Sequence, residues 1–351
     1  MIHAEFALFH SFKLLRRLQS RRIGFQRVST NFACSSRTYA SESPVEVILP
    51  DVIREVEFQL KKRAGAVVRK SRILRAALGP VIFPTYPAYI ISYPKTGRTW
   101  LRVMLGKAIC LGYNQPDALM LLTPRLTADA GLRATRFTHE DALFDGRAWQ
   151  DLDPDKRRYT HSRVLLLTRD IKDTVVSNYF HATKRARSFT GTLAEFIRHD
   201  SWGAKKIITY YEYWYSARNV PEEFQLLRYE DMHRSPRAAL EIALELAGAT
   251  GLASSVLDQA VEFGSFSNMK KLEAGGYFVD RRMKPGDPSD QSSFKVRQGG
   301  SGESAKMLTP ADISYIDGLV INSGCPWVTS VAGGERKLHS EEATSSPFLR
   351  G

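Results

Sequence analysis

Residues 88–112, AYIISYPKTGRTWLRVMLGKAICLG, place a loop with lysine, glycine and threonine between two different apolar patterns. Residues 88–92 are mostly β-branched or aromatic, which predicts a buried strand. From Thr99 onward the apolar side chains recur at helical spacing, which predicts a helix with one buried face. A loop that leads from a strand into a helix collects backbone N–H groups at the positive end of the helix dipole. The stretch therefore predicts a site for an anion.

The side chains of this loop suit the same purpose. Gly97 allows the main chain to approach an anion closely, and Lys95 supplies a mobile positive charge. Thr96 and Thr99 offer hydroxyl donors. The loop lacks the GxxxxGK[ST] pattern of ordinary nucleotide hydrolases. A simple capped turn with a surface lysine is the alternative interpretation, and the combination of features favours the anion site.

Two further apolar runs indicate a parallel sheet. Residues 164–168 (VLLLT) and 224–231 (FQLLRYED) predict strands, and helical patterns follow each of them, over 170–187 and from Ser235-Pro236 onward. Strands that alternate with helices predict an α/β fold, with a parallel, doubly wound sheet flanked by helices in a single domain.

The remaining segments define the expected domain boundaries. Residues 1–43 are rich in arginine and nearly free of acids, which is typical of an organelle transit peptide or of a disordered basic leader. We expect a helical extension at 44–79, the main domain at 80–328 and a disordered tail at 329–351. Residues 270–305 are rich in glycine, proline and serine, which is typical of a functional lid or of disorder.

Composition limits the classes of partner. The 351 residues carry a net charge of +13, and residues 1–40 alone hold seven basic side chains and one acidic side chain. A small, highly charged anion explains such a balance without nucleic acid. The three cysteines show no metal-like spacing, which favours a reduced, intracellular protein. No run approaches the roughly 18 apolar residues of a membrane span, so we expect a soluble chain.

The loop from Tyr93 to Trp100, YPKTGRTW, resembles the 5′-phosphosulfate loop of the PAPS-dependent sulfotransferases, YPK[ST]GTTW, in the pattern of the cytosolic type. PAPS is 3′-phosphoadenylyl sulfate. The resemblance covers about residues 85–325 and implies a fold like that of the P-loop nucleoside triphosphatases. It departs from the family at Arg98, where a small hydroxyl residue is common. It implies a cofactor loop formed by Lys95, Thr96, Gly97, Arg98, Thr99 and Trp100.

A second segment, LLLTRDIKDTVVSNYFH, resembles the family's RxPxDxxVSxY strand and helix, which grip the 3′-phosphate of PAPS. The resemblance implies that Arg169 and Ser177 bind this phosphate. An arginine fork can hold a phosphate dianion through two hydrogen bonds, and a serine in the following helix adds a hydroxyl donor.

Two more segments follow the family's order. GSFSNMKK, residues 264–271, resembles [TS]SFxxMK and implies that Phe266 packs on the adenine; an ordinary core phenylalanine is the alternative. VRQGGSG, residues 296–302, resembles RKGxxGDW and implies cofactor contacts from Arg297, Gln298 and Gly299. Because Gln298 replaces a lysine and the DW pair is missing, we expect a weaker anion grip from this segment.

The resemblance also implies the catalytic groups. Sulfuryl transfer needs alignment and charge stabilisation, so Lys95 would stabilise the bridging oxygen as the leaving phosphate gains charge. His139, in RFTHEDALF, lies where the family carries the base of its KTHxP segment and would remove the acceptor proton, although Phe137 replaces the lysine and Glu140 follows. Glu140 and His161 are the competing bases. Lysine and arginine can neutralise the anion, so no metal is expected. Two further histidines, His181 and His199, are expected to have packing or surface roles.

The leading hypothesis is an enzyme that transfers a sulfuryl group from PAPS to a hydroxyl or amine of a small-molecule or glycan acceptor. A nucleotide-dependent phosphotransferase is the first alternative, and the missing GK[ST] pattern argues against it. A non-catalytic nucleotide-binding protein is the second. The sequence leaves open the acceptor, a homodimer, and the choice between the cytoplasm and a mitochondrion or plastid reached through a cleaved leader.

Overall fold

The computed structural model describes residues 85–140, 142, 146–278, 280, 283, 287, 290, 293–295, 302 and 304–328. All of them belong to one compact unit, residues 83–351. The expected leader, helical extension and tail lie outside the described residues, so those boundaries stay predictions.

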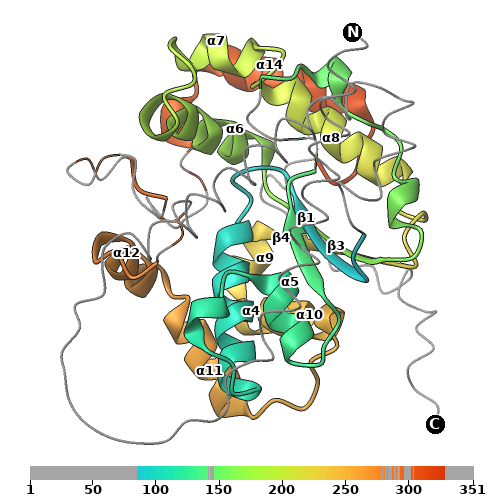
Figure 1. Ribbon diagram of the computed structural model, residues 1–351. Coiled ribbons are helices and arrows are strands. Elements are labelled where there is room, and N and C mark those ends of the chain that lie inside the picture. Colours follow the sequence, from blue (N-terminus) through green and yellow to red (C-terminus); the bar gives the residue numbers. More distant parts are fainter. Residues whose placement is uncertain are drawn as a thin grey trace, which may run out of the picture. The chain divides into compact units, whose positions relative to one another are not determined.

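A sheet of four parallel strands forms the centre of this unit (Figure 1). The strands are β1 (Ala88–Ser92), β2 (Thr135–Thr138), β3 (Arg163–Thr168) and β4 (Glu223–Arg228), in the order β2-β1-β3-β4. The chain leaves β1 toward one side of the sheet to form β2, and then returns to the other side to form β3. In such sheets ligands bind beyond the carboxyl ends of the strands, where this direction reverses. Here that place lies between β1 and β3.

Helices cover both faces of the sheet, because successive side chains of a strand point to opposite sides. Ala88 and Ile90 of β1 belong to one core, whereas Tyr89 and Ile91 belong to the other. The first core is covered by α4 (Arg98–Gly112), α10 (Pro236–Ala247) and α11 (Ser254–Phe263). The second is covered by α6 (Ile171–Phe180), α8 (Ala204–Ser216) and α14 (Pro310–Ser323). Figure 1 shows the two groups of helices on either side of the strands. The predicted doubly wound α/β fold is confirmed.

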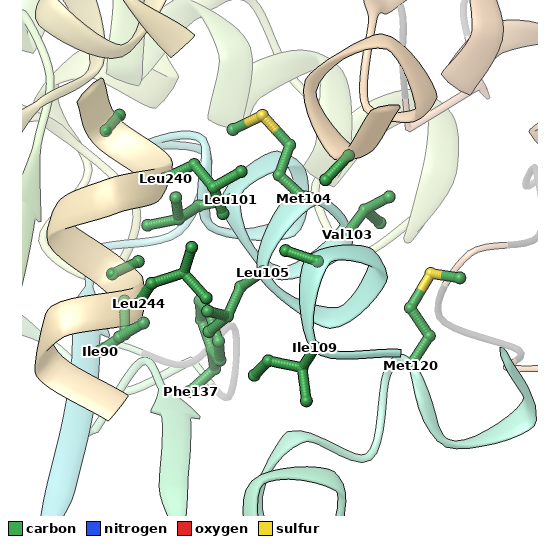
Figure 2. Packing of buried hydrophobic residues seen from close by; sticks show 14 of the residues in the cluster. Ile90, Leu101, Val103, Met104, Leu105, Ile109, Met120, Phe137, Leu240 and Leu244 are labelled. Atoms are coloured by element: carbon green, nitrogen blue, oxygen red, sulfur yellow. The ribbon is translucent and has the colours of Figure 1, made fainter. Parts of the chain in front are cut away.

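The apolar face of α4 fixes the helix on the first side of the sheet. Leu101 and Leu105 are fully buried near Leu240 and Leu244 of α10, with Ile90 of the sheet beneath them (Figure 2). Burying one leucine side chain contributes about 1.5–3 kcal/mol relative to leaving it in water. This packing holds the first turn of α4, and therefore the loop before it, at the edge of the sheet.

The remaining elements connect these layers. They are η1 (Asp117–Leu119), α5 (Thr123–Asp129), η2 (Trp149–Asp151), η3 (Arg157–Tyr159), the π-helical turn η4 (His181–Arg185), α7 (Leu193–Arg198), α9 (Tyr229–Arg234), α12 (Phe266–Ala274) and α13 (Ser304–Met307). None of the helices within the described ranges combines the length and the apolar character that a membrane span requires.

The structure corrects the sequence prediction at several points. The strand predicted over 224–231 ends at Arg228, and Tyr229 begins α9. Glu230 and Asp231 lie in the first turn of that helix, where acidic side chains are stabilising. The short strand β2 was not predicted, and α12 extends to Ala274 within a segment expected to be irregular. The helix predicted over 170–187 is α-helical only to Phe180 and continues as the π-helical turn.

Candidate functional site

The segments that follow the four strands meet at one edge of the sheet, because the carboxyl ends of parallel strands lie together. The lysine loop, residues 93–97, follows β1, and His139 comes directly after β2. Arg169 comes directly after β3, and Tyr229 directly after β4. The structure therefore brings together Lys95, His139 and Arg169, which were proposed separately from the sequence, and it adds Tyr229.

The main chain of the lysine loop adopts a tight conformation. Lys95 and Gly97 both have positive φ angles, 72° and 86°. The hydroxyl of the fully buried Thr96 donates to the carbonyl of Tyr93 at 2.8 Å, so this hydroxyl stabilises the loop itself and does not point outward as a donor. No side chain caps the start of α4. The first N–H groups of an α-helix have no acceptor within the helix, so this end suits an anion.

Glycine is required at position 97 for two reasons. Its φ of +86° is unfavourable for other residues, and an added Cβ would lie 2.7 Å from Cδ2 of Tyr229. Tyr229 packs under the loop, where its ring also contacts Trp100, with centroids 6.1 Å apart. The loop and the start of α9 are thus fitted to each other.

We predict that Gly97→Ala destabilises the protein by about 1–3 kcal/mol more than Gly131→Ala does, because only the first substitution adds a clash to the strained φ. Gly131 is a matched control, since its φ is +73° and nothing lies within 4 Å of an added Cβ. Urea denaturation of both variants measures the difference. Equal losses would show that Tyr229 does not constrain the loop.

Arg169 links the end of β3 to the lysine loop. Its Nη1 donates to the carbonyl of Lys95 at 3.2 Å, and its guanidinium carbon lies 4.3 Å from the ring centroid of Tyr229. The side chain is 9% exposed, and Nη2 lies 3.8 Å from the carboxylate of Asp173. The arginine is therefore held rigidly beside the loop with little exposure to water.

Helix α6 carries Ser177, the second residue predicted to bind the 3′-phosphate. Ser177 lies one turn after Asp173 and therefore on the same face of the helix. Asp173 on this face contacts Arg169. Burial raises the pKa of Asp173, but the backbone N–H groups of Gly302 and Ser304 donate to its carboxylate and hold the pKa below its ordinary value. The residues that follow the predicted cofactor segment 297–299 are thereby held against α6. Arg297, Gln298 and Gly299 themselves lie outside the described residues.

His139 is oriented by the strand next to it. Its Nδ1 lies 2.9 Å from the carbonyl oxygen of Ser92, the last residue of β1. A carbonyl oxygen can only accept, so Nδ1 carries the proton and Nε2 keeps a lone pair. Burial, followed by the positive charge of Arg98, lowers the pKa of His139 well below its ordinary value of 6.5. The imidazole is therefore neutral at pH 7, as a general base must be.

The two competing bases have other surroundings. The Oε2 atom of Glu140 accepts from Lys156 at 3.1 Å and from the indole N–H of Trp214 at 2.9 Å. Both partners of the Glu140–Lys156 ion pair are buried, with side chains 5% and 3% exposed. Glu140 thus anchors the segment after His139 in the core. His161 is exposed at the end of a surface turn. The geometry favours His139.

Local sequence patterns did not indicate that Arg98 is joined by further cations around these residues. Arg98 and Arg102 of α4 and Lys295 lie close enough to His139 to lower its pKa, and Arg185 of η4 and Lys295 lie close enough to His181 to lower its pKa. Burial, then the charges of Lys95, Arg185 and Lys295, lower the pKa of His181 to about 3. His181 was expected to pack or to face the surface, but it lies near the lysine loop. No sequence pattern connects these positions, because they come from separate elements.

Aromatic side chains occupy the outer part of the corner. Trp100 is half-buried against Tyr229 and against His233, with the latter centroids 5.6 Å apart. Phe266 is the first residue of α12 and is 39% exposed, so it is not an ordinary core phenylalanine. His199 is exposed, and its Nδ1 accepts from the backbone of Ser201 at 3.0 Å. Across the described ranges, histidine, cysteine and acidic side chains form no cluster of three suited to a metal.

Known proteins that are similar to this chain in sequence are sulfotransferases. The model of the sulfotransferase domain matches residues 151–320, which include Arg169, Ser177 and Phe266. Cytosolic sulfotransferase 16 of Arabidopsis thaliana is 27% identical over 252 residues, which are 66% of this chain and 74% of the relative. Cytosolic sulfotransferase 17 of the same plant is 26% identical over 253 residues, 66% of this chain and 72% of the relative.

A solved structure is also similar. The crystal structure of mouse sulfotransferase SULT7A1 complexed with PAP has a TM-score of 0.46 and 18% sequence identity. The similarity covers 68% of this chain and 83% of the mouse chain.

Proposed function

We propose that this chain belongs to the sulfotransferase family of enzymes, which transfer sulfuryl groups, and that it takes the group from PAPS. The acceptor is a hydroxyl or amine of a small molecule or glycan. The observation that carries the proposal is the contact between Arg169 and the carbonyl of Lys95 at 3.2 Å. This contact places the lysine loop after β1 beside the arginine after β3, at one edge of the sheet. We expect a single doubly phosphorylated adenosine to reach both.

The residues of the corner fit such a nucleotide. The uncapped start of α4, with Gly97, Arg98 and Thr99, suits the 5′-phosphosulfate, and the hydroxyl of Thr96 holds the loop in its conformation. Arg169 is nearly buried and lies beside α6, so it suits the 3′-phosphate together with Ser177 on that helix.

Two aromatic side chains are candidates for binding the adenine base of the nucleotide. Phe266 and Trp100 offer aromatic faces to the adenine, and the exposure of Phe266 leaves its ring accessible. Arg297, Gln298 and Gly299 add cofactor contacts from the segment that Asp173 anchors at its far end.

Two side chains perform the chemical roles. Lys95 places a positive charge at the loop, where it stabilises the oxygen that links phosphate and sulfuryl group as this oxygen gains charge. The Nε2 atom of His139 accepts the proton of the acceptor hydroxyl, while Ser92 holds the opposite nitrogen and keeps the imidazole in the correct tautomer.

Loss of the Arg169 fork should weaken PAP binding selectively. We expect Arg169→Ala to raise the Kd for PAP by about tenfold to a hundredfold, which corresponds to the roughly 1.5–3 kcal/mol of a charged hydrogen bond. The Kd for adenosine 5′-phosphosulfate, which lacks the 3′-phosphate, should change much less. Isothermal titration calorimetry with both nucleotides measures the two values.

A second variant separates phosphate binding from support of the loop, because Arg169 also contacts Lys95. Ser177→Ala should weaken PAP and leave adenosine 5′-phosphosulfate unchanged, since no contact with the loop is removed. If both variants weaken the two nucleotides equally, the 3′-phosphate is not bound here. Failure of the unmodified protein to bind PAP would reject the proposed donor.

A further inference from the structure

The cations near the lysine loop form a group that we call the cationic cluster: Arg98, Arg102, Arg185 and Lys295. The guanidinium carbon of Arg102 lies 4.8 Å from the ring centroid of Phe137, two residues before His139. Arg185 Nη1 and the backbone N–H of Lys295 both contact Oε1 of Glu273, at 3.4 Å and 2.7 Å. Separate elements thus bring positive side chains to the surroundings of the base.

These cations are built into the protein. The side chain of Arg185 is 12% exposed and that of its partner Glu273 is 0% exposed, and Arg102 is 9% exposed as a whole. Removing charges from water costs free energy unless opposite charges compensate them. Burial, followed by the charges of Arg185 and Arg98, lowers the pKa of Lys295 well below its ordinary value. A bound anion would relieve this mutual repulsion.

The nucleotide accounts for only part of the cluster. Arg98 begins α4 at the loop, where the phosphosulfate is expected. Arg102 lies one turn further along α4, over Phe137 of β2, the strand that His139 follows. Arg185 ends the π-helical turn that begins with His181. An acceptor must approach the Nε2 atom of His139, and Arg102 lies near enough to lower the pKa of this base.

We propose that the acceptor carries an oxyanion in addition to its reacting hydroxyl, and that Arg102 and Arg185 bind this oxyanion. The inference rests on the proposed sulfuryl transfer from PAPS and narrows its substrate class to acidic small molecules. A carboxylate, a sulfonate and a phosphate ester present the same chemistry to two guanidinium groups.

The first test is a panel of acceptor pairs, each pair sharing one scaffold. Phenol, naphthol, sterol and hexose scaffolds would each be offered as a carboxylate and as the neutral carboxamide, with labelled PAPS. A sulfonate and a phosphate ester of the best scaffold would distinguish the source of the charge. We expect kcat/KM to be about tenfold or more higher for the acidic member of the best pair. A best acceptor that is neutral, or no turnover of any acidic member, would overturn the inference.

The second test uses variants and compares acceptor KM with the Kd for PAP. Arg102→Met and Arg185→Met should each raise KM for the acidic acceptor about tenfold and leave the Kd for PAP within about twofold. Arg185→Lys keeps the charge beside Glu273 and should restore most of the affinity. Arg125→Met, which removes a surface charge 70% exposed, is the matched control and should change neither value.

The outcomes separate the two proposals. If Arg102→Met and Arg185→Met weaken PAP as much as they raise acceptor KM, the cluster serves the nucleotide and the acidic acceptor is rejected. If the unmodified protein binds no PAP, the donor assignment fails, whatever the acceptor panel shows.

Discussion

Lys95→Met should lower kcat by about 10²–10³-fold while the Kd for PAP rises by much less. The reason is that a positive charge aimed at the leaving oxygen acts mainly when that oxygen gains charge, and removal of such a group typically costs about 2.7–4 kcal/mol of transition-state stabilisation. PAP already lacks the sulfuryl group, so its affinity reports the ground state. Single-turnover rates with PAPS and calorimetry with PAP measure the two effects.

The Lys95→Met substitution should leave the conformation of the lysine loop unchanged. Methionine keeps the length of the side chain, and the Arg169 hydrogen bond uses the carbonyl of residue 95, which the substitution retains. Lys184→Met is the control, because Lys184 lies exposed on the neighbouring π-helical turn. Equal losses in kcat and in PAP affinity would reject the transition-state role and leave Lys95 as a binding residue.

His139→Ala should also abolish most activity, by about 10²–10⁴-fold in kcat, which is the usual contribution of a general base. Substitution of the competing histidine, His161→Asn, should leave the rate unchanged, since His161 is exposed. A circular dichroism melt distinguishes loss of the base from loss of the fold. Normal turnover by His139→Ala would assign the proton transfer to another group.

The pH dependence gives an independent test of the base. Burial and the nearby arginine lower the pKa of His139 well below 6.5, so the neutral, active form persists as the pH falls. For the unmodified enzyme, kcat/KM for PAPS reports the free enzyme and should stay level between about pH 8 and about pH 6, then fall at lower pH as His139 becomes protonated. An acid limb centred at or above pH 6.5 would contradict this environment.

Local sequence patterns predicted the fold class and the positions of strands β1 and β3 well. The apolar runs at 88–92 and 164–168 match β1 and β3 closely, because a strand buried on both faces needs an uninterrupted apolar segment. Prediction was wrong at Tyr229, where the residues at the end of the third run begin α9 instead. The short strand β2 has only four residues, and its pattern is too brief to detect.

In the candidate site, too, features that depend on neighbouring residues were predictable from the sequence, whereas features that depend on residues far apart in the chain were not. The strand, loop and helix around Lys95 are specified within one stretch, so the sequence could indicate an anion site there. The choice between His139 and Glu140, which are neighbours in the chain, depends on partners far away: Ser92 for the histidine, and Lys156 with Trp214 for the glutamate. Those distances arise only when the strands and helices pack.

By itself the sequence determined the alternating strands and helices and the loop chemistry at Lys95, because periodicity and glycine conformation act over short stretches of chain. Only the tertiary structure decided that Arg102 and Lys295 lie near His139, that Arg185 lies near His181, and that Tyr229 excludes any side chain at Gly97. The physical reason is that electrostatic and steric interactions depend on distance in space, which the order of residues does not record.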